Sequence, residues 1–175
     1  MAWLLLKPVM ATDLNNQENT ILLKRSAKIM NVYFISSHEN SCQAECSFRS
    51  CPERFLNNLQ EIPSLPLINR IPKTHLFQPT MSTPLRNGDL LIFHAESESD
   101  INHLIESRNI IEQLRLILII GEEAFQDSWN YHQLNPRYTM NSQQNVTDLR
   151  DVVTKIFNHT HQETAESNTT NQVNL

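Results

Sequence analysis

A histidine and three cysteines in the stretch 38–51 are the first residues whose types and spacing suggest chemistry. His38, Cys42 and Cys46 stand at successive intervals of four, and Cys51 follows five residues later. On a helix the first three would share one face, and thiolates with an imidazole form a zinc-type ligand set. The tight Cys-x-x-Cys spacing of structural zinc sites is absent. We therefore expect partly buried thiols here and no bound metal.

His94 is a second candidate, because it directly follows the apolar run Leu90–Phe93. A histidine at a strand end could serve as a phosphohistidine or as an acid–base group. A single histidine without a recognisable partner is more often a hydrogen-bonded structural residue, so both interpretations stay open. Ser36 and Ser37 end another short run, where they could help to bind an anion or simply terminate a strand.

The composition excludes several classes of function. A chain of 175 residues is enough for one domain with a good core, but it contains only two glycines. A phosphate cradle of backbone amides usually needs several glycines in one loop, so neither a nucleotide nor another cofactor is expected. The formal net charge is −5 and no basic stripe is present, which argues against a nucleic-acid partner.

The sequence predicts a cytoplasmic protein without a membrane span. No apolar run is long enough to cross a bilayer. The apolar residues 2–6 are followed at once by Lys7 and Pro8, which makes a poor signal-peptide core. Three cysteines are an odd number and do not suggest a disulfide framework.

The first half of the chain predicts a strand, a helix and a weakly marked second strand. Val32–Ile35 is β-branched and aromatic, as in a buried strand. Pro52 suits a first helical turn, and apolar residues then repeat at helical spacing until Pro63. The second strand could lie within Leu65–Ile71, where a proline favours an edge position, or within Thr74–Phe77.

The second half carries stronger signals. Leu90–Phe93 and Leu116–Ile120 are continuous apolar runs, as expected of strands covered on both faces. Between them, Ser99 or Asp100 could cap a helix whose apolar stripe continues to Leu114. The elements predicted to follow are a short helix with Phe125, Trp129 and His132, a strand at Tyr138–Met140, and an amphipathic helix over Val146–Phe157.

The alternation of strands and helices predicts one α/β domain over residues 30–158. Units of this length imply right-handed crossovers and therefore a parallel sheet with helices on both faces. Residues 1–29 lack a sustained apolar period and are expected to be a loosely ordered extension. Residues 159–175 have too little apolar surface to offset the entropy lost on ordering, so a disordered polar tail is expected.

The segment from Asn87 to Phe157 resembles the second half of a response-regulator receiver domain. In receivers the third strand ends in the phosphoacceptor Asp, five residues after an Asp that opens it. Asp89-Leu-Leu-Ile-Phe-His94 has this layout, with His94 at the acceptor position. The resemblance implies a receiver-like (flavodoxin-like) fold: a three-layer, doubly wound, five-stranded parallel sheet in the order 2-1-3-4-5.

The other functional positions of receivers also differ in this chain. Gly121 stands where the fourth strand of receivers ends in Thr or Ser. Asn141, three residues after Tyr138, stands for the active-site Lys, and Ser36-Ser37 stand for the acidic pair that holds magnesium. Phosphorylation of a receiver needs a carboxylate nucleophile, hard oxygen ligands and a lysine. The resemblance therefore implies a degenerate pseudo-receiver that cannot run the phosphorylation switch.

The register leaves one alternative at the acceptor position. Glu96 lies two residues after His94, so on an extended strand both side chains would point to the same face. A longer strand would place Glu96 near the acceptor site, in an acidic patch with Glu98 and Asp100. The same carboxylates would equally favour the first turn of the next helix.

The resemblance also implies a surface for partners. In receivers the fourth helix, fifth strand and fifth helix meet other proteins, and Trp129, Tyr131 and Tyr138 fall on these elements. Aromatic residues of this kind anchor interfaces. The i, i+4 spacing of Phe125 and Trp129 would equally fit a pair facing the core.

Two hypotheses follow. The first is a non-catalytic signalling domain that binds a protein partner, or a second copy of itself, through this surface; it predicts a buried, unreactive region around His94. The alternative is a small flavodoxin-like enzyme or phosphocarrier that uses His94 or a cysteine at the carboxyl edge of the sheet. It predicts an open pocket with His94 exposed and paired to a carboxylate.

Overall fold

The structure is a computed structural model that describes residues 30–36, 51–77, 85–122 and 129–170. The predicted extension over residues 1–29 therefore lies outside the described residues, as do Ser37, His38, Cys42 and Cys46.

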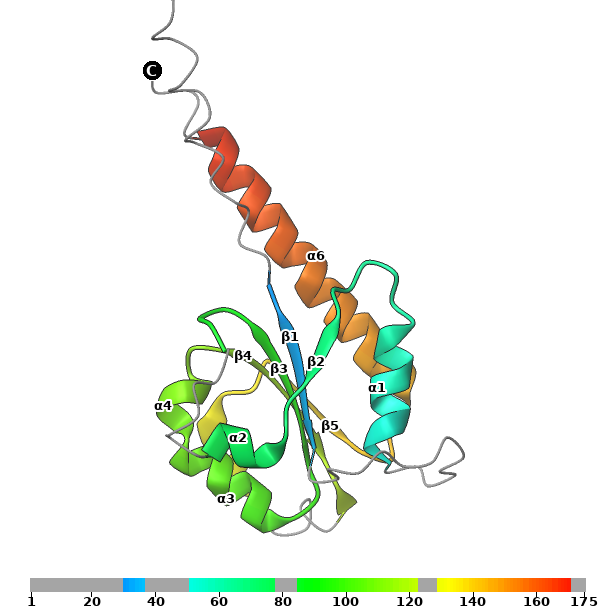
Figure 1. Cartoon of the computed structure of the whole chain (residues 1–175), viewed down its shortest axis with the longest axis vertical. Helices are drawn as coiled ribbons and strands as arrows, with labels where there is room; N and C mark the ends of the chain where they lie inside the picture. Colours follow the sequence, from blue (N-terminus) through cyan, green and yellow to red (C-terminus); the bar gives the residue numbers. More distant parts are fainter. Residues whose placement is uncertain (1–29, 37–50, 78–84, 123–128, 171–175) are drawn as a thin grey trace, which may run out of the picture.

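The described residues form a five-stranded parallel sheet with the strand order β2-β1-β3-β4-β5. Helices cover both of its faces (Figure 1). This confirms the α/β fold, the parallel pairing and the strand order predicted from the sequence. The strands are β1 (Val32–Ser36), β2 (Ile68–Arg70), β3 (Leu90–Ala95), β4 (Arg115–Ile120) and β5 (Tyr138–Asn141).

Alternating side chains of the central strands build two separate cores. Val32, Phe34 and Ile92 point to the face that carries α1 (Pro52–Gln60) and α6 (Val146–Thr170), which we call the α1–α6 face. Their neighbours, such as Leu91 and Phe93, point to the opposite α2–α3 face. That face is covered by α2 (Lys73–Phe77), α3 (Glu98–Glu106), α4 (Arg108–Ile111) and the 3-10 helix η2 (Trp129–Leu134).

The second strand is shorter than either sequence candidate. It occupies Ile68–Arg70, inside the first proposed range, and sits at the edge of the sheet as the neighbouring proline suggested. The rival candidate Thr74–Phe77 is wrong, because those residues lie in α2. Pro72 directly precedes that helix. A residue at this position donates no hydrogen bond within the helix, so the missing N–H of proline costs nothing there.

The helix between β3 and β4 begins and divides differently from the prediction. Its N-cap is Ser97, and not Ser99 or Asp100. Asp100 stands three residues into the helix instead, where its carboxylate accepts the N–H of Ser97 at 3.2 Å, as the acidic residue of a capping box does. The predicted single apolar stripe is split into α3 and α4, because α3 ends at Glu106 and Ser107 joins the two helices.

The last helix extends beyond its predicted end. Val146, Leu149 and Val153 are buried against the α1–α6 face, as the amphipathic pattern predicted. The helix then continues to Thr170, whereas the sequence predicted a disordered tail from residue 159. Arg115, at the start of β4, donates a hydrogen bond to the hydroxyl of Thr160, which ties the first turn beyond Phe157 to the sheet. The helix projects past the amino edge of the sheet (Figure 1).

Candidate functional site

The carboxyl ends of β1, β3, β4 and β5 meet at one edge of the sheet, the lower edge in Figure 1. The register places Ser36 directly beside His94 and Ile120 beside Asn141. This is the edge at which open α/β sheets usually bind their ligands. The structure therefore brings the described receiver-type positions of the sequence together, as the predicted fold requires.

His94 is buried, with 1% of its surface exposed. Its ring faces the α1–α6 side, where the ring of Phe55 from α1 lies 5.8 Å away between centroids. Its Nδ1 lies 3.6 Å from a carboxylate oxygen of Glu96, which itself is 30% exposed. The imidazole therefore has the carboxylate neighbour that the enzyme hypothesis predicted, together with the burial that the binding hypothesis predicted.

His94 and Glu96, the two candidates for the acceptor position, differ in their place relative to the end of β3. β3 ends at Ala95, so Glu96 lies just beyond the strand and His94 occupies the last-but-one strand position. The predicted acidic patch is not one continuous surface. Glu98 is exposed in the first turn of α3, while Asp100 is buried with 1% of its surface exposed.

Lys73, the first residue of α2, also lies at the carboxyl edge of the sheet, and the sequence did not predict it there. Its ammonium forms an ion pair with a carboxylate oxygen of Asp100. Burial lowers the pKa of Lys73 below its ordinary value, and the nearby Glu96 carboxylate opposes that shift. The second oxygen of Asp100 accepts the N–H of Glu96 at 2.8 Å. The Asp100 charge is thus engaged by the chain itself, and the contact leaves no local signal in the sequence around Lys73.

The positions that follow β4 and β5 are also occupied by structural contacts. A Cβ atom at Gly121 would lie 3.1 Å from the carbonyl oxygen of Ala95 and 3.2 Å from the Cα of Glu96. The side chain of Asn141 accepts the N–H of Gln143 at 2.8 Å, so it shapes its own turn. Ser142, the next residue, is fully buried. These contacts leave little room for a reacting group at this end of β4 and β5.

Cys51 is the member of the cysteine cluster that the structure describes. Cys51 is buried with a free thiol and immediately precedes α1 as its N-cap residue. Its proposed co-ligands lie outside the described residues. Within the described segments, no three side chains of His, Cys, Asp or Glu gather closely enough to hold a metal ion.

The aromatic residues proposed for an interface do not form one patch. Tyr131 is half-buried against the core of the α2–α3 face, where its ring lies 4.2 Å from that of the exposed His132. Tyr138 is half-buried against the core of the opposite, α1–α6 face. Trp129 opens η2, and its side chain is outside the described part of the structure.

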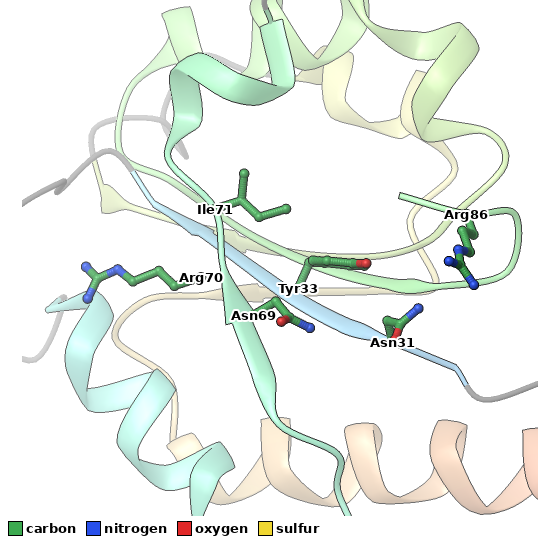
Figure 2. Close-up of a pocket in the computed structure, with 6 residues that line it drawn as sticks. All are labelled: Asn31, Tyr33, Asn69, Arg70, Ile71 and Arg86. Carbon is green, nitrogen blue, oxygen red and sulfur yellow. The ribbon is translucent and has the colours of Figure 1, made fainter. Parts of the chain in front are cut away.

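A pocket that the sequence reasoning did not anticipate lies on the other side of the domain. It has a volume of about 370 Å³ and is lined by Asn31, Tyr33, Asn69, Arg70, Ile71 and Arg86 (Figure 2). These residues come from β1 and β2, from the residues next to them in the chain, and from the segment before β3. Asp89, which matched the opening Asp of the receiver layout, lies behind it and is buried.

No protein-family model matches this sequence, and no curated protein matches it either. Among the described residues, no helix combines the length and the apolar character that a bilayer crossing requires.

Proposed function

We propose that this protein is a non-catalytic, receiver-like interaction domain, and that its carboxyl edge has lost the chemistry of a phosphorylation switch. The main support is the burial of His94, because a phosphoryl acceptor must be reached by its donor and this side chain is only 1% exposed. The ring of Phe55 covers it from α1.

The neighbouring positions support the same proposal. Receiver chemistry needs hard oxygen ligands for magnesium and a cation for the phosphoryl charge. Here Ser36 is buried beside His94, and Asn141 accepts a hydrogen bond from its own turn. At Gly121 a Thr or Ser side chain would press on the backbone of Ala95 and Glu96.

The alternative, a phosphocarrier or small enzyme based on His94, has one observation in its favour. The Glu96 carboxylate lies 3.6 Å from Nδ1, which is within ion-pair distance but longer than the hydrogen bond by which a carboxylate orients a catalytic imidazole. The same alternative based on a cysteine has less support, because the described thiol of Cys51 is buried. Accessibility of His94 therefore decides between the two hypotheses.

We expect no phosphoryl transfer to the protein from acetyl phosphate in the presence of magnesium. Intact-mass spectrometry after incubation should show the unmodified chain, for the wild type and for His94→Ala alike. A phosphoryl adduct on the wild type that disappears in His94→Ala would contradict the proposal and establish the phosphocarrier. An adduct on both proteins would place a nucleophile elsewhere and would equally remove the claim that the domain is inert.

The interaction surface that we propose is formed by η2, β5 and α6. β5 is the last strand of the described sheet, and edge strands offer their outer backbone groups to partners. His132 and Arg137 are exposed beside it, and Asp151 and Lys155 are exposed on α6. Among the described residues, Leu67 is the large apolar side chain that is exposed. It precedes β2, at the opposite edge of the sheet from β5. The exposed side chains that the structure describes on the proposed surface are therefore polar, which favours a reversible association.

We expect a reversible homodimer in sedimentation equilibrium, with the double variant His132→Ala/Arg137→Ala weakening it about tenfold, equivalent to about 1.4 kcal/mol. The matched control is Asn57→Ala/Gln60→Ala, because these residues are equally exposed but lie on α1. If the control weakens the dimer and the first variant does not, the surface is assigned wrongly. A monomer at every concentration would exclude the homodimer and leave only a different protein as partner.

We also infer a cytoplasmic location. The support is the free thiol of Cys51 together with the odd number of cysteines, three, in the chain.

A further inference from the structure

The pocket beside β1 and β2 lies away from the carboxyl edge and is independent of the function proposed above. It sits over the amino-terminal half of β1, because β2 pairs with Val32–Phe34 and Asn31 precedes the strand. Its volume of about 370 Å³ falls within the range of roughly 300–1,000 Å³ that small-molecule sites usually have. The cavity is therefore large enough for a small organic ligand.

Two arginines line this pocket, and they differ in what their guanidinium groups do. The side chain of Arg70 points away from the pocket toward α1, where it pairs with Glu53 (Figure 2). Arg70 therefore contributes mainly backbone to the wall. Arg86 is exposed at the pocket, and within the part of the chain that the structure describes no carboxylate forms an ion pair with its guanidinium.

The segment that carries Arg86 is held in place by Asp89. One carboxylate oxygen of this buried residue accepts the N–H of Arg86 at 2.9 Å, and the other accepts the N–H of Asn31 at 3.0 Å. The side-chain amide of Asn31 also donates to this carboxylate, at 3.3 Å and 3.4 Å. The backbone of Arg86 and the side chain of Asn31 are therefore held by a single buried group, so this wall of the pocket is formed before any ligand arrives.

The phenol of Tyr33 adds a neutral polar group to the pocket wall. The ring is buried and its hydroxyl points along the pocket toward the side of Arg86 (Figure 2). Burial raises the pKa of Tyr33, Asp89 raises it further, and Arg86 partly opposes both. The phenol therefore stays protonated at neutral pH and adds no negative charge to the pocket.

The charges around the pocket select the kind of anion that it can hold. A planar guanidinium matches a carboxylate through two parallel hydrogen bonds. The buried negative charge of Asp89 lies directly behind the site and opposes a doubly charged anion such as phosphate. Ile71 and the ring of Tyr33 offer apolar contact to the body of a ligand, and Asn31 and Asn69 offer polar groups.

We propose that this pocket binds a small organic monocarboxylate, whose carboxylate is held by Arg86 and whose body lies against Tyr33 and Ile71. The side-chain amino groups of Asn31 and Asn69 already donate to the protein, so their amide oxygens accept hydrogen bonds from polar substituents of the ligand. The class of ligand follows from the exposed guanidinium of Arg86, the neutral polar groups beside it and the apolar wall, in a cavity of this size.

The test is a nuclear magnetic resonance titration of the full chain with benzoate, 4-hydroxybenzoate and N-acetylglycine. We expect saturable shifts of the side-chain signals of Asn31, Asn69 and Arg86 for at least one of them. The neutral analogue benzamide should bind about tenfold more weakly than benzoate, because it lacks the charge that pairs with the guanidinium.

Arg86→Gln should weaken binding about tenfold or more, whereas Arg70→Gln should leave it within about twofold of the wild type. Both arginines are exposed and removing either lowers the charge equally, so the pair separates a specific contact from general attraction. Arg86→Lys keeps the charge without the planar fork and should bind at an intermediate strength. The proposal fails if none of the three carboxylates binds, if benzamide matches benzoate, or if Arg70→Gln has the larger effect.

Discussion

Replacing Phe55 by Ala should lower the free energy of unfolding by about 3–5 kcal/mol, the usual effect of truncating a fully buried aromatic residue. Phe55 has no exposed surface and lies in the core between α1 and the sheet. A domain of this size typically has a free energy of unfolding of about 5–15 kcal/mol, so the variant should still fold but be much less stable. Urea denaturation at equilibrium measures the difference. Asn57→Ala, an exposed change on the same helix, should stay within about 0.5 kcal/mol of the wild type.

The same variant tests the access to His94. Diethyl pyrocarbonate modifies exposed imidazoles, and the exposed His132 and His159 serve as internal references. In the wild type His94 should react far more slowly than either, and in Phe55→Ala its rate should rise, because the ring that covers it is gone. If His94 of the wild type reacts as fast as His132, the imidazole is accessible and the phosphocarrier becomes the better hypothesis.

The central strands could be predicted from the sequence because their apolar runs are continuous. Leu90–Phe93 and Leu116–Ile120 are covered on both faces, and every residue of these runs is buried. Such runs leave few alternatives for a chain of this length. β2 was poorly defined for the opposite reason: of its three residues only Ile68 is buried, so the local pattern carries little information.

The predicted helix boundaries were wrong where no residue type marks the end of a helix. Ser107 divides α3 from α4 without a glycine or a proline, so the apolar stripe looks uninterrupted in the sequence. The polar stretch after Phe157 has no core-facing stripe, yet it continues the helix to Thr170. Extending an existing helix fixes one residue for each new hydrogen bond and avoids the cost of nucleation, so composition alone misleads at this end.

The two groups of side chains that matter most for the proposals depend on long-range pairing. The monocarboxylate pocket joins residues from Asn31 to Arg86, which only the pairing of β1 with β2 and β3 brings together. The contact of Lys73 with Asp100 likewise joins the starts of two different helices. No periodicity in a single segment encodes such contacts. The position of His94 near the end of β3 could be predicted from the apolar run before it, whereas only one of the two hypotheses predicted its burial.

Replacing Asp100 by Ala should lower the free energy of unfolding by roughly 2–4 kcal/mol. The buried carboxylate accepts the N–H groups of Glu96 and Ser97 at 2.8 Å and 3.2 Å, and its other oxygen pairs with Lys73. The change therefore leaves two backbone donors without their acceptor and removes the partner of a partly buried ammonium. Glu98→Ala is the matched control, since Glu98 is an acidic residue of the same helical turn but is exposed. It should change stability by at most about 0.5 kcal/mol.

A double-mutant cycle separates the ion pair from the helix cap. Lys73→Met alone leaves the Asp100 charge buried without its cation and should also destabilise the domain. With Asp100→Asn, which can no longer pair as an anion, the two changes together should cost less than the sum of the single changes, by about 1 kcal/mol or more. Additive losses would mean that Lys73 and Asp100 act independently. In that case Asp100 would stabilise the fold only by capping α3, and its ion pair with Lys73 would contribute nothing to the stability of the domain.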